Sequence, residues 1–177
     1  MEETEQRGAE PCLSASPLPS RNTVERPAFL ADRMLGKLAR WLRIMGYDTE
    51  YAEEVDDSTL ARVASEKGRI LLTRDRALHS RKSVRSIYIS AADPEEQLRA
   101  LAFSCHLVFD ETRMRCSLCN GIIVCVPRDQ AAGRVPDGVL ARHSRFYVCG
   151  KCGKIYWRGS HWDRIMTVMN GVVAPGL

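Results

Sequence analysis

The chain has 177 residues, of which 45% are hydrophobic and 27% are charged, a composition that suits a fold with a buried core in water. No apolar stretch approaches the ~20 residues that a membrane span requires, and the acidic start over residues 1–3 lacks the apolar core of a secretory signal. Membrane and export roles are therefore excluded, and we expect a cytoplasmic protein.

The net charge of +4 is distributed unevenly along the chain. Residues 113–166 hold ten Lys and Arg against three Asp, a balance of +7, whereas residues 27–112 have a balance of −1. A basic segment beside a nearly neutral one favours an anionic partner, with nucleic acid first in line. A solvated basic surface without a partner explains the charge equally well.

The first 26 residues combine three prolines with several serines and show no hydrophobic period. Such a composition buries too little apolar area to offset the entropy of ordering, so we predict a disordered tail over residues 1–26. From residue 28 the apolar pattern changes between strand and helix periods. Strands are predicted over 28–31, 48–52, 69–73 and 86–90, and helices over 35–45, 57–68 and 94–105.

This alternating order, with unbroken apolar strands, predicts an α/β fold in which a parallel sheet carries helices on both faces. Sites in such sheets lie beyond the carboxyl ends of the strands. Asp32 ends the first strand, Asp75 follows the third, and Asp56 and Asp57 open the second helix. Several carboxylates at one sheet edge repel one another, and an oxygen-only ligand set suits Mg²⁺ or Mn²⁺.

Each of these acids also has an ordinary structural explanation. Asp56 or Asp57 can cap the helix that follows, and Asp75 can be a turn residue. Asp93, which precedes Pro94, fits a helix cap better than a metal ligand. Asp32 is the hardest to explain in this way, because it ends an apolar strand.

Several motifs resemble those of one family. The run from Phe29 to Arg43 reads FLADRMLGKLARWLR and is followed by GYDT from Gly46, then by Asp56 and Asp57, and by RILLTRDR from Arg69. In amino-acid sequence and in their order along the chain, these motifs closely resemble the PIN-like RNase domain first described at the carboxyl terminus of the Mut-seven exoribonucleases. The resemblance covers roughly residues 28–166 and includes a zinc ribbon that the family appends.

The resemblance implies a PIN-type nuclease domain over residues 27–110, with Asp32, Asp75 and the Asp56/Asp57 pair as metal-binding acids. The register of the second helix favours Asp57 over Asp56. The chemistry expected there is metal-assisted hydrolysis of RNA by water, without a covalent enzyme intermediate. PIN domains often pair, which brings a homodimer into consideration.

Basic residues lie next to these acids in the sequence. They fit phosphate contacts, although a solvated helix face is an equal alternative for any one of them. Those assigned to nucleic-acid binding here are Arg33, Lys37, Arg40, Arg74 and Arg76.

Five of the seven cysteines lie between residues 116 and 152 and mark a second module. Two C-x2-C pairs, Cys116 with Cys119 and Cys149 with Cys152, have the spacing of a tetrahedral structural Zn²⁺ site in a ribbon that we place over residues 113–166. Proline and glycine residues between the pairs suit turns. Four thiolates leave no open position for catalysis, so the zinc would hold a basic surface that includes Arg158. Residues 167–177 are expected to be a tail.

The leading hypothesis is thus a ribonuclease whose PIN-like domain cuts RNA, expected to be single-stranded, and whose ribbon presents it. The aromatic residues of the ribbon either stack on unpaired bases or form its core. The alternative is a non-catalytic nucleic-acid-binding adaptor.

Overall fold

Four short parallel strands form the centre of the first half of the protein, whose computed structural model describes residues 26–172. The expected N-terminal tail lies outside the described residues except for Arg26, as do residues 173–177 of the expected C-terminal tail. The strands are β1 (Phe29–Ala31), β2 (Thr49–Tyr51), β3 (Ile70–Thr73) and β4 (Ser86–Tyr88). Their order in the sheet is β2-β1-β3-β4, with Phe29 level with Thr49 and Ile70. The predicted parallel α/β architecture is confirmed.

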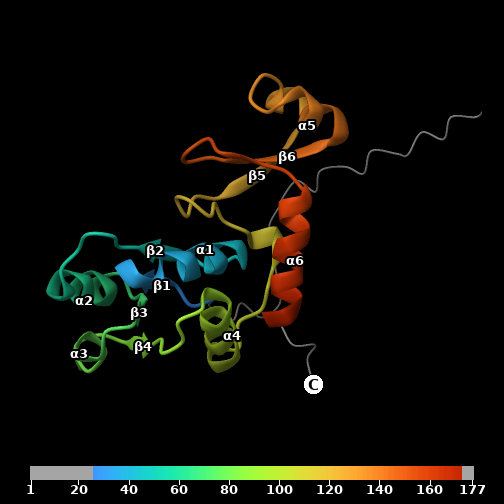
Figure 1. The fold of residues 1–177 in the computed structure, drawn as a ribbon. Helices are drawn as coiled ribbons and strands as arrows, with labels where there is room; N and C mark the ends of the chain where they lie inside the picture. Colours follow the sequence, from blue (N-terminus) through green and yellow to red (C-terminus); the bar gives the residue numbers. More distant parts are fainter. Residues whose placement is uncertain (1–25, 173–177) are drawn as a thin grey trace, which may run out of the picture.

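Helices cover both faces of this sheet (Figure 1). Side chains alternate along each strand, so Phe29 and Leu72 pack into a core with α1 and α4, whereas Leu30 and Leu71 pack against α2 and α3 on the other face. The helices are α1 (Gly36–Ile44), which follows the 3-10 turn η1 (Arg33–Leu35), α2 (Asp57–Glu66), α3 (Arg76–His79) and α4 (Pro94–Cys105). No helix within residues 26–172 has the length and apolarity needed to cross a membrane.

A three-stranded antiparallel sheet forms the second half, which we call the ribbon. A small core of Val126, Ala131, Val135 and Phe146 supports it. Between its first two strands the chain forms short helices where the sequence predicts only turns. Its elements are β5 (Ile123–Pro127), η3 (Arg128–Ala131), α5 (Asp137–Arg142), β6 (Arg145–Cys149) and β7 (Ile155–Tyr156), preceded by η2 (Glu111–Arg113).

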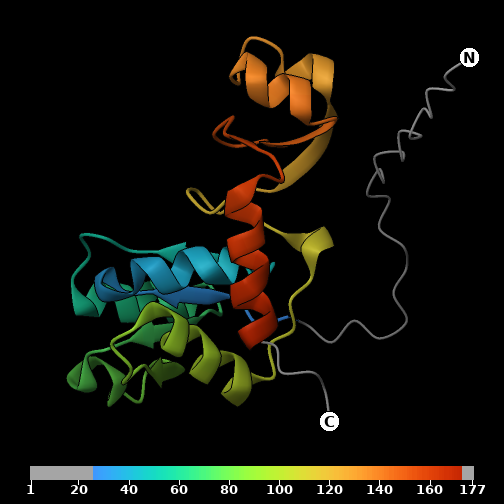
Figure 2. The same cartoon turned by 45° about the vertical axis from the view of Figure 1, so that its right-hand side comes forward.

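The last helix, α6 (Ser160–Val172), returns the chain from the ribbon to the first half. Figure 2 shows it running from the ribbon down the side of α1 and α4. Val168, Met169 and Val172 are buried in the same core as Phe29. The predicted ribbon boundary at residue 166 lies inside this helix, which continues to residue 172 where the sequence analysis expects a tail.

Candidate functional site

The carboxyl ends of β1 and β3 border a cleft. From β1 the chain turns into η1 and α1 on one face of the sheet, and from β3 it turns into α3 on the other face. Neighbouring strands whose connections leave in opposite directions open a crevice, the usual ligand site of parallel sheets. The cleft found there has a volume of about 610 Å³, and its lining includes Arg33, Arg74, Gln97 and, from the ribbon, Leu118.

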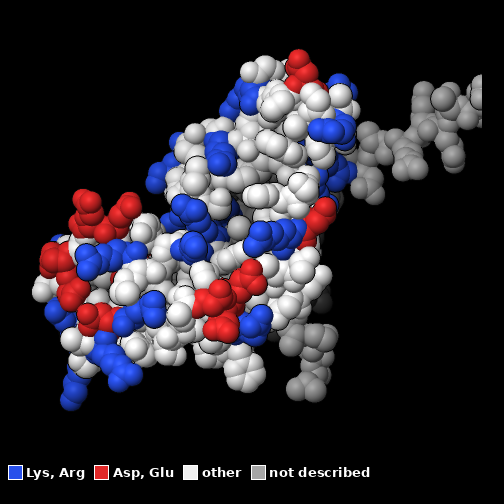
Figure 3. All heavy atoms as spheres, viewed as in Figure 1, with Lys and Arg blue, Asp and Glu red and all other residues white. Residues whose placement is uncertain are grey.

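Positive charge dominates this cleft. Its lining contains five cationic side chains and one carboxylate, that of Glu53. The cationic residues are Arg33, Lys37, Arg40, Arg43 and Arg74. In the view of Figure 3, basic side chains predominate over the ribbon and along its boundary with the sheet half, whereas most acidic side chains lie over the sheet half.

Four of the six residues predicted to bind nucleic acid thus line the same cleft, and the other two lie elsewhere. Arg76 lies over the ring of Tyr88, 5.4 Å from its centroid. Arg158 forms an ion pair with Glu111, and its guanidinium lies 5.1 Å from the ring centroid of Trp162.

Asp32 lies at the end of β1 and is almost fully buried, with 6% of its surface exposed. Its Oδ2 accepts hydrogen bonds from the Thr73 hydroxyl (2.5 Å) and the Arg74 backbone N–H (3.1 Å), and its Oδ1 accepts one from the Met34 N–H (2.8 Å). These bonds compensate for burying a carboxylate. They also connect the end of β1 to the end of β3, so Asp32 holds the two sides of the crevice together.

The other predicted acids cap helices. Asp75 accepts a hydrogen bond from the Leu78 N–H, and its own N–H donates to Thr73 Oγ1, which links it to Asp32 through one side chain. Asp56 caps α2, and Asp57 is exposed in the first turn of that helix. Hydrogen bonds from the Thr59 side chain and from the Thr59 and Ser58 N–H groups keep the pKa of the Asp56 carboxyl below its usual value. Asp93 caps α4, as the sequence suggests.

Asp32, Asp57 and Asp75 do not form a compact ligand set. Within residues 26–172, the four thiols described below are the only group of three or more Cys, His, Asp or Glu side chains with ligand atoms within 4.8 Å of one another. Mg²⁺ in proteins is often held by one or two carboxylates together with water and a substrate phosphate. Asp75 is exposed, whereas Asp32, at the end of the adjacent strand, is almost fully buried. The ligand assignment of the acids stays a prediction.

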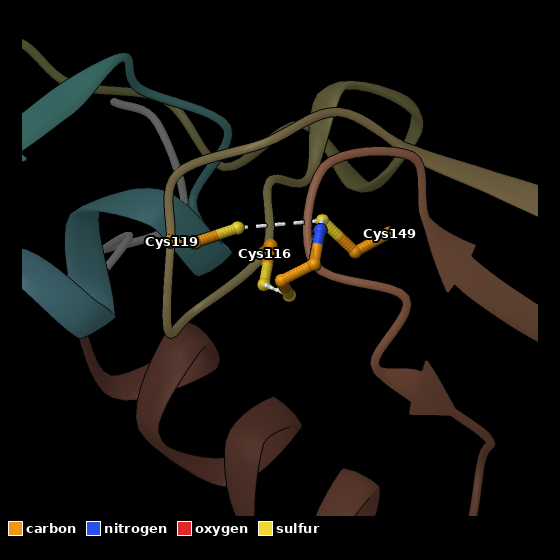
Figure 4. A group of neighbouring side chains, drawn as sticks. Cys116, Cys119 and Cys149 are labelled. Atoms are coloured by element: carbon orange, nitrogen blue, oxygen red, sulfur yellow. Dashed lines mark hydrogen bonds between the residues drawn. The ribbon is translucent and has the colours of Figure 1, made fainter.

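The four predicted zinc cysteines do come together. Cys116 and Cys119 lie before β5, and Cys149 and Cys152 lie at and after the end of β6; Figure 4 shows Cys119 and Cys149 facing each other with Cys116 between them. The Sγ atoms of Cys116 and Cys152 are 3.6 Å apart, and those of Cys119 and Cys149 are 3.4 Å apart. A tetrahedral Zn²⁺ with ~2.3 Å bonds places its sulfurs roughly 3.8 Å apart, so the cluster fits a zinc site.

The ionisation of these thiols also favours a bound cation at the cluster. Burial opposes ionisation of Cys116, but hydrogen bonds from the Tyr156 hydroxyl and from backbone N–H groups lower the pKa of this thiol to about 6. Burial and the neighbouring thiols raise the pKa of Cys119 to about 12. One thiolate therefore forms readily, whereas a second one beside it requires a compensating positive charge.

Arg43 connects the cysteine cluster to the sheet half. It is 6% exposed, and its Nε donates to the carbonyl of Thr49 (2.8 Å) while Nη1 donates to the carbonyls of Ser117 and Leu118 (3.0 Å each). Burial lowers the pKa of Arg43 and the thiols of Cys116 and Cys119 act in the opposite direction, yet a guanidinium stays charged at neutral pH. A buried cation thus holds the loop between Cys116 and Cys119, which forms one wall of the cleft.

A second connection runs through Asn120. Its Oδ1 accepts a hydrogen bond from the Thr49 N–H (3.1 Å), and its Nδ2 donates to Asp48 Oδ1 (2.8 Å). Asp48 also pairs with Arg69 (2.8 Å) and Arg115 (3.5 Å). Burial would raise the pKa of Asp48, but the hydrogen bonds from Arg69 and Asn120 hold it below its usual value. The cysteine loop is therefore bonded to the edge of β2.

We expect the Asp48→Asn substitution to lower the free energy of unfolding at neutral pH by about 1–2 kcal/mol, because the substitution weakens charge-assisted hydrogen bonds at a half-buried junction. The matched control is Glu66→Gln, which breaks an exposed ion pair with Arg62 and should cost only about 0.3–0.5 kcal/mol. Urea unfolding of both variants with zinc bound measures the difference. Equal costs would contradict a structural role for Asp48 at the junction.

Sequence reasoning missed the roles of Arg43, Glu53 and Asn120. Arg43 had a usable signal, because it follows Leu35 and Ala39 at the spacing of the buried face of α1. Glu53 follows the second strand and could have been added to the acids at the sheet edge. No local pattern distinguishes Asn120, since its partners Asp48 and Thr49 are about seventy residues away.

Comparison with known proteins agrees with this architecture. A family model described as the Mut7-C RNAse domain matches residues 27–169, which include the sheet half, the cysteine cluster and most of α6. No curated protein and no solved structure matches the chain. Because the match covers most of the 177 residues, the chain belongs to the Mut7-C RNAse domain family.

Proposed function

We propose that this protein is a ribonuclease that hydrolyses phosphodiester bonds of single-stranded RNA in the cleft at the carboxyl ends of β1 and β3. The observation that carries the proposal is the gathering of Arg33, Lys37, Arg40, Arg43 and Arg74 around one cleft. Cations in this arrangement bind successive phosphates. Tyr51, which also lines the cleft, offers a ring on which an unpaired base can stack.

Hydrolysis builds negative charge on the phosphate oxygens and on the leaving oxygen. The exposed cations Arg33, Lys37 and Arg40, together with Arg74, would bind the phosphate and stabilise that charge, whereas Arg43 is bonded to backbone carbonyls. Asp75 is not part of the cleft lining but directly follows Arg74, which is, and from there it would accept a hydrogen bond from the attacking water. Asp32 would keep Arg74 beside the phosphate through its bond to the Arg74 N–H. Mg²⁺ or Mn²⁺, when held near Asp32 and Asp75, supplies further charge neutralisation and helps to ionise water.

The ribbon belongs to the same proposal. Its segment 113–166 carries a charge of +7, and Leu118 places part of it in the cleft wall. We propose that it adds affinity for RNA, with zinc as a structural element that holds the surface.

The direct test is incubation of the purified protein with labelled single-stranded RNA and Mn²⁺, before and after EDTA is added. Zinc content is measured in each sample, so that loss of a catalytic ion is separated from loss of the ribbon. Cleavage that requires Mn²⁺ while zinc stays bound supports the proposal. The absence of cleavage under every divalent ion, with RNA still bound, would contradict it.

The cleft itself is tested by Arg33→Gln, Lys37→Gln and Arg40→Gln combined. All three side chains are exposed, so the fold should persist while RNA affinity at low salt falls by at least about 10-fold and the slope of log affinity against log salt becomes shallower by roughly 2. The control replaces Arg62, Lys82 and Arg85, exposed cations outside the cleft. Equal loss in both triple variants would mean that general charge, not the cleft, binds RNA.

A non-catalytic nucleic-acid-binding adaptor is the second candidate. It is favoured by one observation, that Asp32, Asp56 and Asp75 each cap the turn or helix that follows. The adaptor would show the same salt dependence and the same effect of the cleft variants, without any cleavage.

A further inference from the structure

A second groove lies on the ribbon and shares no lining residue with the cleft. Its volume is about 330 Å³, and three segments form it: residues 134–136 before α5, residues 153–154 after the second cysteine pair, and Ile155 with Trp157 at β7. The nuclease proposal does not use this groove.

The groove combines an aromatic side chain with positive charge. Trp157 is 36% exposed, and the apolar side chains of Val135, Pro136 and Ile155 lie around the same hollow. Arg134 and Lys154 are both exposed cations, and the lining contains no carboxylate. Neither cation takes part in an ion pair with another residue of the described part of the chain.

Two side chains hold the groove in shape through contacts with glycine residues. The Arg134 guanidinium donates a 2.7 Å hydrogen bond to the carbonyl of Gly153, which fixes its direction while leaving other N–H groups free for a ligand. The Trp157 indole packs closely against Gly159, where an added Cβ would lie 3.1 Å from Nε1 and the ring would have to shift slightly to accommodate it. Gly153 follows Cys152 directly, which ties one wall to the cysteine cluster.

We infer that this groove is a second nucleotide-binding site, in which one base of a single-stranded RNA stacks on Trp157 and the adjacent phosphates bind Arg134 and Lys154. An aromatic face beside cations is the arrangement that binds single strands without sequence preference. The charge of +7 over residues 113–166 favours a polyanion over a neutral or basic protein partner. The inference rests on the proposed function in one respect, that RNA held in the cleft extends onto the ribbon.

The test compares two lengths of fluorescein-labelled oligouridylate, about 4 and about 16 nucleotides, chosen to span the site sizes of single-strand-binding domains. Binding to the full zinc-loaded chain is followed by fluorescence anisotropy without added Mg²⁺ or Mn²⁺. Trp157→Ala should weaken binding of the long RNA by about 5-fold or more, the cost of losing one stacked base, and should leave the short RNA unchanged. Trp157→Phe, which keeps a ring, should retain most of the affinity.

Two results would overturn the inference: long RNA that binds Trp157→Ala as tightly as the wild type, and both lengths weakened to the same extent. If Trp157→Ala loses zinc, the double variant Arg134→Gln with Lys154→Gln tests the groove instead. Both side chains are exposed, so these substitutions should leave the fold intact and weaken binding of the long RNA alone. Failure of the proposed function gives a different result from failure of this inference. In that case the cleft variants leave binding and cleavage unchanged while the groove variants still weaken the long RNA.

Discussion

Removal of zinc is expected to unfold the ribbon while the parallel sheet and its helices stay folded. The ribbon core consists of four buried side chains, too few to support the module alone, whereas structural zinc sites contribute apparent binding free energies of ~10–16 kcal/mol. The core shared by α1, α4 and α6 contains none of the four clustered cysteines. Hydrogen exchange after treatment with a strong chelator should show lost protection over β5, β6 and β7 and retained protection in β1, β3 and α6.

Zinc removal should also weaken binding of RNA to the cleft, although the metal is not part of the cleft. The reason is the loop between Cys116 and Cys119, whose carbonyls accept hydrogen bonds from Arg43 and whose Leu118 lines the cleft. Without the metal this wall is still held by its hydrogen bonds to Arg43 but no longer by the bonds of its cysteines to zinc. Cys119→Ser should reproduce the loss, whereas Cys105→Ser, at the end of α4, should bind RNA and zinc as the wild type does. A ribbon whose exchange is unchanged after zinc has left would contradict this account.

The secondary structure of the sheet half could be predicted because local patterns determine it. Apolar runs such as Ile70–Thr73 are buried on both faces, and helices such as Pro94–Cys105 carry their own cap and first-turn acids. The cysteine cluster was predictable for a similar reason, since each short C-x2-C spacing brings two thiols to one point. In each case the information lies within a few residues.

The remaining features depend on contacts between distant parts of the chain. The spacing of Val168, Met169 and Val172 is that of an amphipathic helix, yet only the fold shows that α6 packs against α4 in the main core. The spacing of Arg43 places it on the buried face of α1 and no local pattern distinguishes Asn120, but the partners of both residues are carbonyls and carboxylates brought to them by folding. The position of Asp32 was predictable, but its three hydrogen-bond partners were not.

Asp75→Asn is expected to reduce the single-turnover rate of RNA cleavage with Mn²⁺ by about 100-fold or more, the contribution typical of a positioned acid-base or electrostatic group. The fold should be unaffected, because Asn caps a helix as well as Asp does and can still accept the Leu78 N–H. The matched control is Asp110→Asn, which alters another capping carboxylate outside the cleft and should cleave at the wild-type rate.

Measuring the cleavage rate and the stability of Asp32→Asn beside those of Asp75→Asn separates a catalytic role of Asp32 from a structural one. An amide at position 32 directs an NH2 group at the N–H of either Arg74 or Met34, so one buried donor faces another. We expect a loss of about 1–3 kcal/mol in the free energy of unfolding in addition to the loss of cleavage. If Asp75→Asn cuts RNA at the wild-type rate while Asp32→Asn does not, the effect of Asp32 is structural and the assignment of these carboxylates to catalysis is wrong. If both variants bind RNA normally and neither cuts it, the carboxylates act in the chemical step and the arginines of the cleft in binding.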